Sequence, residues 1–378
     1  MPDNKNVPSP FPPPLPPGPE YGNPEDVRQA VPDGRPATSA KKKQEPPRKR
    51  TASATYAAGY FSSGQFDKEV RAYQGCASRT TGYAELDNQQ PFYPGLYCLG
   101  AISSLGKTTF AHQMADQVAA AGGNVLYFSL EQSHFELYSK SLARGFAITR
   151  NADAEKNNGF SQYPTPSSID IRRGLTTAYP DKMAAQIDAY TQAVGDRLCV
   201  IDGSFSLTVE DIRDLTAAYV KQTGKAPVVI VDYLQIIAPS TINGRIPDTK
   251  TSIDHIVHTM KVMQRDLNLS VLLISSLNRQ NYMTPIDFES FKESGGIEYT
   301  ADVVWGLQLS VLNDELFSKE NRIKEKREKI REEKARPRRK IDLVCLKNRY
   351  GISSYTLPFT YIPACDYFIS EKPAPADC

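Results

Sequence analysis

The chain has 378 residues, a formal net charge of +2 and 40% hydrophobic residues, and half of its 28 prolines fall in the first 50 positions. No apolar run approaches the roughly 20 residues of a transmembrane helix, and the polar, proline-rich N-terminus is unlike a secretory signal. The six cysteines are scattered without a Cys-x-x-Cys pair, which argues against a disulfide framework and against structural zinc. We therefore expect a cytoplasmic protein that does not associate with membranes.

Residues 1–55 are expected to be a disordered, proline-rich and basic tail. Positions 11–17 read Phe-Pro-Pro-Pro-Leu-Pro-Pro, which favours polyproline II and cannot build a core, and basic clusters follow at 41–43 and 48–50. A solvated tether is the simpler interpretation, and a tail that binds nucleic acid or a partner protein is the alternative. In the linker that follows, residues 56–79, Phe66, Val70 and Tyr73 have the spacing of one face of a short helix.

From residue 80 to about 370 the sequence alternates short apolar runs with amphipathic segments. Strands are predicted at 96–100, 124–130, 197–201, 227–232, 270–275, 303–309, 341–346 and 354–359. Helices are predicted at 108–121, 132–146, 180–194, 208–222 and 251–268. This rhythm predicts one α/β domain with a mainly parallel, twisted sheet flanked by helices. The last strands follow one another without helices, so that edge should be antiparallel, and residues 371–378 should form a C-terminal tail.

One segment within this domain has the pattern of a phosphate-binding loop. Positions 101–109 read Ala-Ile-Ser-Ser-Leu-Gly-Lys-Thr-Thr, and they lie between a predicted strand and a predicted helix. The backbone N–H groups of such a loop bind anions, Lys107 would neutralise the β- and γ-phosphates, and the Thr108 hydroxyl would hold Mg²⁺. We therefore predict a P-loop NTPase that binds ATP and Mg²⁺ through Ala101, Ser103, Ser104, Leu105, Gly106, Lys107, Thr108 and Thr109.

Two acidic residues stand where predicted strands end, downstream of this loop. Asp232 ends the apolar run Val-Val-Ile-Val-Asp, where a carboxylate can hold the Mg²⁺ shell through water. Glu131 ends another such run, where a carboxylate can orient and deprotonate the water that attacks the γ-phosphate. A helix cap or a surface charge is the alternative for either acid alone, but two such acids favour a nucleotide site.

The chain from Thr80 to about Ile369 resembles the ATPase domain of DnaB-type replicative helicases, within the RecA-like superfamily. The likeness rests on segments that come in the order of that family, at 81–87, 101–108, 128–133, 231–235, 275–279, 292–298 with 301–304, and 347–351. It implies that Glu131 is the catalytic glutamate and that Gln235 belongs to the second nucleotide motif. It further implies that Arg349 is an arginine finger acting in trans, and that Lys292, Glu293 and Gly295 contact DNA. Lys347, two residues before Arg349 on a predicted strand, would face the same γ-phosphate.

The resemblance implies an ATP-hydrolysing DNA helicase that assembles as a homo-oligomeric ring, expected to be a hexamer. Such a ring would move 5′→3′ on single-stranded DNA during replication, of a plasmid, phage or integrative element, and the tail would contact replication partners. We expect the chain to depart from the family in three ways: Ser276 stands where the family usually has Gln, the N-terminal primase-binding domain is expected to be absent, and residues 319–340 are added.

The added segment is highly charged, with 12 Lys or Arg and 5 Glu among 22 residues. The pair Glu325/Lys329 has the i, i+4 order that supports a solvated helix, and Pro337 should end that helix. An extra contact to DNA or to a partner is the alternative, because the excess of basic charge would bind phosphates.

Two other functions fit parts of the sequence. A RecA-like, DNA-dependent ATPase that loads or assists other proteins without unwinding DNA is compatible with Ser276. A scaffold whose tail recruits partners is the other, although Lys107, Thr108, Glu131 and Asp232 argue against a vestigial ATPase.

Overall fold

The computed structural model describes residues 56–77, 79–241, 244–278, 282–291, 294–319 and 322–372. The chain divides into two compact units, Met1–Glu69 and Val70–Cys378. The expected N-terminal tail and residues 373–378 of the expected C-terminal tail lie outside the described residues.

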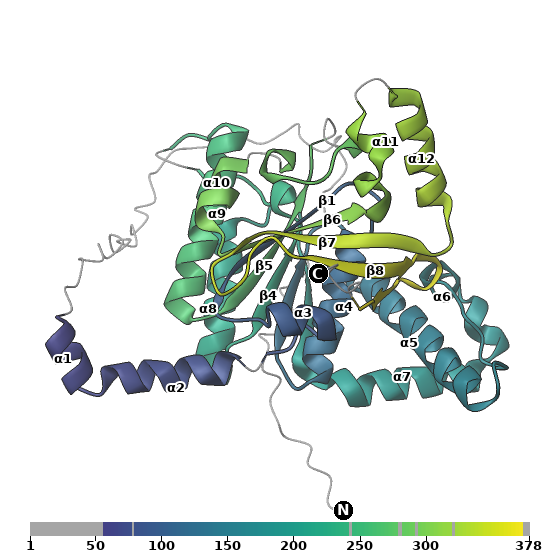
Figure 1. Cartoon of the computed structure of the whole chain (residues 1–378). Coiled ribbons are helices and arrows are strands. Elements are labelled where there is room, and N and C mark those ends of the chain that lie inside the picture. The colour runs from purple at the N-terminus through teal and green to yellow at the C-terminus, as the bar shows by residue number, and fades with distance from the viewer. Residues whose placement is uncertain are drawn as a thin grey trace, which may run out of the picture. The chain divides into compact units, whose positions relative to one another are not determined.

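The first unit holds helix α1 (Ala57–Ser62) and the beginning of helix α2 (Gln65–Ala77), which fall in the segment expected to carry a short helix (Figure 1). The rings of Tyr60, Phe61 and Phe66 pack against one another, with centroids 5.3 to 6.1 Å apart. Phe61 and Phe66 nevertheless remain exposed, so this aromatic group is only partly buried within its own unit.

The second unit is built on one nine-stranded sheet with the order β3-β2-β4-β5-β1-β6-β7-β8-β9. The first six strands in this order are parallel, and β7, β8 and β9 continue the sheet antiparallel. The prediction of a mainly parallel sheet with an antiparallel C-terminal edge is therefore confirmed. The strands are β1 (Gly95–Ala101), β2 (Val125–Ser129), β3 (Leu198–Asp202), β4 (Val228–Asp232), β5 (Ser270–Ser276), β6 (Val303–Leu309), β7 (Arg339–Asn348), β8 (Thr356–Ile362) and β9 (Tyr367–Ser370).

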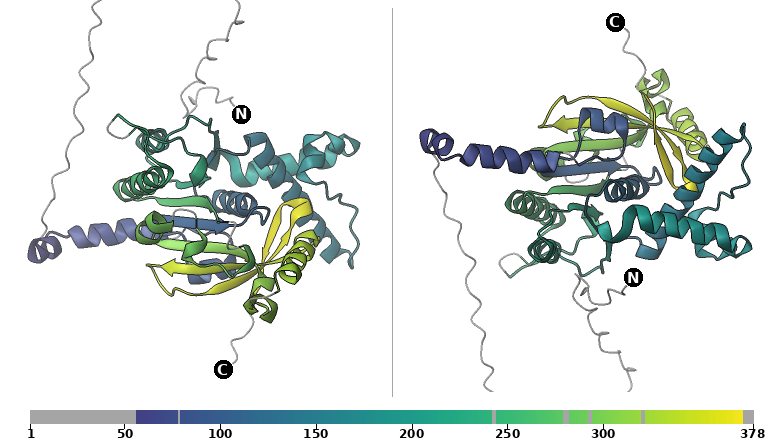
Figure 2. Two further views of the ribbon diagram at one scale, coloured as in Figure 1. Left: turned by 90° about the horizontal axis from the view of Figure 1, so that it is seen from above. Right: turned by 90° about the horizontal axis from the view of Figure 1, so that it is seen from below.

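Helices flank this sheet on both faces (Figure 2). The chain moves along the sheet in one direction from β1 to β2 and in the other from β4 to β5, so right-handed crossovers place α4 and α9 on opposite faces. Helices α5 and α7 pack beside α4, and α8 and α10 pack beside α9. The helices of this unit are α3 (Ala84–Gln89), α4 (Lys107–Ala120), α5 (His134–Lys156), α6 (Ser168–Arg172), α7 (Pro180–Val194), α8 (Val209–Thr223), α9 (Thr249–Leu267), α10 (Ser294–Thr300), α11 (Glu315–Ser318) and α12 (Ile323–Ala335).

An aromatic cluster joins the start of the domain to its antiparallel edge. Tyr83 stacks on Phe110 of α4 with centroids 4.7 Å apart, and Phe359 of β8 and Phe368 of β9 meet Phe110 edge-on at 5.3 and 5.1 Å. All four rings are buried, so the last strands are fixed against the helix that follows β1. None of the helices in the described part of the chain is long and apolar enough to cross a bilayer.

Candidate nucleotide-binding site

The strand order explains why motifs far apart in sequence meet at one place. Strands β2, β4, β5 and β1 are consecutive neighbours and parallel, so their carboxyl ends lie side by side. Ser129 is in register with Asp232, and Ala101 with Ser276. The loop after β1, Glu131 after β2 and Asp232 at the end of β4 therefore share one edge, where ligands bind in open α/β sheets.

The loop between β1 and α4 has the backbone shape of an anion site. Ser104 and Gly106 have positive φ angles of 68° and 86°, and alternating backbone conformations of this kind turn successive N–H groups toward one point. A Cβ at Gly106 would lie 2.9 Å from the ring of Tyr361, so glycine is required there on two counts. The cavity at this loop, about 310 Å³, is lined by Ser104, Gly106, Lys107, Thr108, Thr109, Glu131, Gln132, Lys140 and Tyr361.

Lys107, Thr108 and Glu131 thus line one cavity, as the sequence predicts for a nucleotide hydrolase. The ammonium of Lys107 lies 4.9 Å from the centroid of the Tyr233 ring, which holds the cation at the end of β4. Glu131 is exposed and follows directly after β2, so its carboxylate is open to solvent beside the cavity. Ala101 and Leu105 are fully buried and do not line the cavity.

Asp232 is the buried acid of the site. One carboxylate oxygen, Oδ2, accepts a hydrogen bond of 3.0 Å from the Tyr127 hydroxyl, and the other, Oδ1, has no hydrogen-bond partner among the described residues. Burial raises the pKa of Asp232, while the neighbouring hydroxyls of Thr108 and Tyr127 and the charge of Lys107 act to lower it. A buried, unpartnered carboxylate oxygen beside Thr108 fits a magnesium ion, which prefers oxygen ligands and completes its shell with water and phosphate. No cluster of three or more His, Cys, Asp or Glu with metal-site geometry exists among the described residues.

Thr109 belongs to a polar network that sequence reasoning missed. Its hydroxyl donates to Asp366 at 3.1 Å and accepts from Lys140 of α5 at 3.1 Å. Lys140 also pairs with Asp366 at 3.5 Å, and Ser168 of α6 donates to the same carboxylate at 2.7 Å. The network places a second lysine in the cavity and ties it to the turn between β8 and β9.

Gln235 lies against the end of β5, at Ser275 and Ser276, rather than on the cavity wall. Its amide oxygen accepts hydrogen bonds from the backbone N–H and the hydroxyl of Ser276 at 3.2 and 3.1 Å, and its amide nitrogen donates to the Ser275 hydroxyl at 2.9 Å. Ser276, the residue that replaces the usual Gln, therefore links β5 to the short 3₁₀ helix Leu234–Ile236 that follows β4.

Lys347 and Arg349 lie at the other edge of the sheet. Strand β7 is antiparallel, and its last residue, Asn348, pairs with Val303 at the beginning of β6. Arg349 forms an ion pair with Asp302 at 3.2 Å and donates to the Tyr299 carbonyl at 3.1 Å, while Lys347 donates to the Glu298 carbonyl. Burial, followed by the charge of Arg349, lowers the pKa of Lys347. Neither side chain is near the phosphate loop of its own chain.

The residues expected to contact DNA are only partly placed. Lys292 and Glu293 lie outside the described residues, and Gly295 is in the first turn of α10. A Cβ at Gly295 would meet nothing within 4 Å, so its surroundings are open.

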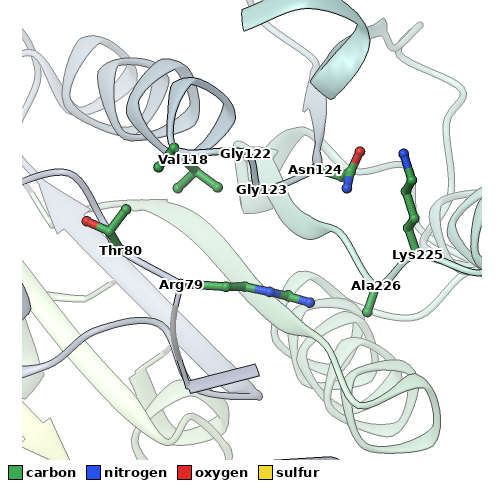
Figure 3. Close-up of a pocket in the computed structure, with 9 residues that line it drawn as sticks. Arg79, Thr80, Val118, Gly122, Gly123, Asn124, Lys225 and Ala226 are labelled. Atoms are coloured by element: carbon green, nitrogen blue, oxygen red, sulfur yellow. The ribbon is translucent and has the colours of Figure 1, made fainter. Parts of the chain in front are cut away.

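A second cavity, of about 350 Å³, lies at the opposite edge of the sheet (Figure 3). It is lined by residues from the domain start, from the end of α4 and the turn after it, and from the segments before β2 and β4: Arg79, Thr80, Val118, Ala121, Gly122, Gly123, Asn124, Lys225 and Ala226. No carboxylate is among these lining residues, and the amino ends of parallel strands are not where such folds bind ligands. We therefore assign no chemistry to this cavity.

The sheet order and the loop geometry define a P-loop NTPase domain of the RecA-like type. The sequence pattern of the DnaB-like helicase C-terminal domain matches residues 79–368, so the chain belongs to that family. It is 26% identical over 260 residues to the replicative DNA helicase DnaB of Haemophilus influenzae, covering 66% of this chain and 49% of that protein. The chain thus spans about half the length of the curated relatives that it matches.

The fold is shared with solved structures, among them the following two. One is a solved ATPase domain, which superimposes with a TM-score of 0.61 at 19% identity and covers 84% of this chain and all of that one. The other is a DnaB-like replicative helicase, solved in a study of its interactions with primase, which gives a TM-score of 0.61 at 18% identity and covers 84% of this chain and 67% of that one.

Proposed function

We propose that this chain is the motor of a DnaB-type replicative DNA helicase. It binds ATP with Mg²⁺, hydrolyses the γ-phosphate bond and uses the cycle to move on single-stranded DNA and unwind duplex. The observation that carries this proposal is the convergence of Lys107, Thr108 and Glu131 on one cavity, with the unpartnered oxygen of Asp232 beside Thr108. We place this activity in the cytoplasm.

In this proposal four side chains, together with the backbone of the loop, bind the nucleotide and hydrolyse it. Lys107 and the loop N–H groups bind the phosphates, and Thr108 and Asp232 hold Mg²⁺, Asp232 through water. When bound, the ion neutralises charge on the phosphates. Glu131 accepts the proton of the attacking water.

The motor works as a homo-oligomeric ring, which we propose to be a hexamer. Arg349 and Lys347 lie at the edge of the sheet opposite the phosphate loop of their own chain, which supports a role at the site of a neighbouring subunit. Single-stranded DNA passes residues 292–295, where Lys292 makes a phosphate contact that is independent of base sequence. By likeness to the family the motor moves 5′→3′, and the N-terminal tail serves replication partners.

A strand-displacement assay with ATP and Mg²⁺, on a fork with a 5′ single-stranded arm, tests the proposal. Displacement that requires ATP and that Lys107→Ala abolishes supports a helicase. ATP hydrolysis stimulated by single-stranded DNA but without displacement would instead support the second candidate, a RecA-like ATPase acting as a loader or recombination accessory. That candidate is favoured by Ser276, which bonds to Gln235 where the family usually has a longer Gln.

A further inference from the structure

The charged segment 319–340 folds back onto the phosphate loop through two cationic side chains. Lys334, in the last turn of α12, donates from Nζ to the Ser103 carbonyl oxygen at 3.1 Å. Arg339, the first residue of β7, donates from its guanidinium to the Ser104 carbonyl oxygen at 3.0 Å. These contacts join residues 231 and 235 positions apart in sequence. The segment is therefore not solvated on all sides.

Helix α12 carries two buried charged residues, Lys326 and Glu333, and both are paired. Lys326 is 8% exposed and donates from Nζ to the Phe317 carbonyl at 2.8 Å. Glu333, next to Lys334, is 7% exposed and pairs with Lys329 at 3.7 Å and Arg336 at 3.1 Å. Both pairs of Glu333 are local to α12, so they stabilise its last turn, and the contacts of α12 with β7 place that helix against the sheet.

Each of the two cations is also held by an aromatic ring. The Lys334 ammonium lies 5.9 Å from the centroid of Tyr282, whose hydroxyl is 3.5 Å from Ser103 Oγ, and the Arg339 guanidinium lies 5.8 Å from the centroid of Tyr361, which lines the nucleotide cavity. Burial lowers the pKa of Lys334, and Arg339 acts in the same direction. Lys334 is thus partly desolvated, while both carbonyl hydrogen bonds stay in contact with solvent.

The carbonyls that these cations hold fix the direction of two N–H groups. A trans peptide unit is planar, with its C=O and N–H pointing in opposite directions. Drawing the Ser103 and Ser104 carbonyls toward Lys334 and Arg339 turns the N–H groups of Ser104 and Leu105 to the other side of the loop. Neither N–H donates to another backbone group in the described part of the chain, and Ser104 has a left-handed φ of 68°, which serine rarely adopts without support.

We propose that Lys334 is a positioning residue for ATP binding: it holds the Ser103 carbonyl, and Arg339 holds the Ser104 carbonyl, so that the N–H of Ser104, which lines the cavity, faces the phosphates. The proposal rests on the ATPase function proposed above. With this role α12 becomes part of the nucleotide site, so a displacement of this helix would change the affinity of the protein for ATP. Donors that are already oriented bind charge without first reorganising.

The test compares Lys334→Met with Lys334→Arg in the full chain. Methionine keeps the length and the contact with Tyr282 but removes the charge and the donors, whereas arginine can still donate to a carbonyl. Lys324→Met, an exposed lysine on the same helix, is the matched control. We expect Lys334→Met to weaken binding of a non-hydrolysable ATP analogue by about ten- to a hundredfold, the usual range for a hydrogen bond to a charged group. Lys334→Arg should recover most of that affinity.

The melting temperature without nucleotide separates positioning from folding. Lys334→Met should change it no more than Lys324→Met does, while the stabilisation by the ATP analogue decreases. Parental affinity in Lys334→Met, or an equal loss in Lys334→Arg, overturns the positioning role and leaves the proposed ATPase intact. Failure of the parental protein itself to bind the analogue overturns the ATPase and this inference with it.

Discussion

At the scale of single residues, substitutions of Lys107 and Glu131 are expected to impair ATP hydrolysis in different ways. Lys107→Ala removes the positive charge from the cavity, so both nucleotide binding and turnover should weaken. Glu131→Gln keeps the shape of the side chain but removes the base, so nucleotide should still bind while turnover falls by about 10²–10⁴-fold. Binding of a fluorescent ATP analogue and release of phosphate, measured on the same preparations, distinguish the two effects.

The matched control is Glu155→Gln, which removes an exposed carboxylate on α5 away from the cavity and should leave hydrolysis unchanged. Hydrolysis at the parental rate in Glu131→Gln would show that another group activates the water.

Some residues of the site could be predicted from the sequence, and others could not. The phosphate loop is contiguous, and Glu131 and Asp232 each end an apolar strand, so local patterns were enough to predict where these residues meet. Lys140, Tyr361 and Asp366 have no such pattern, because they reach the cavity only through tertiary packing. The bond from Thr109 to Asp366 joins residues 257 positions apart, and no local periodicity encodes that.

At the scale of elements, the contact between α4 and α5 should make stability depend on pH. His112 of α4 is fully buried and bonded to Ser141 of α5 at 2.8 Å, and Ser141 donates to Asp116 at 2.7 Å. Burial lowers the pKa of His112 to about 4, with the charge of Asp116 acting against that shift and those of Arg144 and Lys140 adding to it. The unfolded chain, with a His pKa near 6.5, therefore binds more protons between about pH 6.5 and 4. The free energy of unfolding should fall as the pH drops through this window, by about 1 kcal/mol between roughly pH 7.5 and 5.5.

Urea unfolding at both pH values tests this for the parental protein and for His112→Asn. The variant should be less stable at the higher pH, because it loses the Ser141 contact, but its stability should change less with pH. His258→Asn, which replaces an exposed histidine on α9, is the control and should keep the parental dependence. An undiminished pH dependence in His112→Asn would mean that other groups cause it.

The bounds of helices and strands with a strong hydrophobic periodicity agree with the predicted ones. The bounds of elements that depend on tertiary contacts do not. The predicted bounds of β6 and α7 coincide with the observed ones. Helix α5 runs ten residues beyond its predicted end, to Lys156, through mostly exposed residues that carry no apolar pattern. Strand β9 has only four residues and was missed; pairing with β8 and the stacking of Phe368 on Tyr361 at 4.3 Å hold it in place. Helix α12 ends at Ala335, two residues before Pro337, as predicted.

At the scale of the whole molecule, the position of Arg349 leads to a prediction about assembly. The residue follows the antiparallel strand β7, so it lies at the amino edge of the parallel sheet, while the phosphate loop lies at the carboxyl edge. An arginine at that edge can serve as a finger only for a neighbouring chain, where it would stabilise charge on the transferring phosphoryl group. Asp302, its partner in the structure, also pairs with Lys261, so removing Arg349 leaves this carboxylate paired.

Arg349→Ala should therefore bind ATP normally but hydrolyse it about 10³–10⁵-fold more slowly, the range known for arginine fingers. Arg150→Ala, an exposed arginine on α5, should hydrolyse at the parental rate. Because the finger acts in trans, specific activity of the parental protein should rise with its concentration as rings form.

Mixing two inactive variants tests the geometry directly. Arg349→Ala supplies an intact phosphate loop and Lys107→Ala an intact finger, so neither can form a complete site in a ring of its own kind. In a randomly mixed ring with head-to-tail interfaces, about a quarter of the interfaces join an intact loop to an intact finger. A 1:1 mixture should then recover activity that neither variant has alone, and the recovery should disappear on dilution below the assembly concentration. Full activity of Arg349→Ala as an isolated monomer would show that each chain completes its own site, and hydrolysis would no longer require a ring.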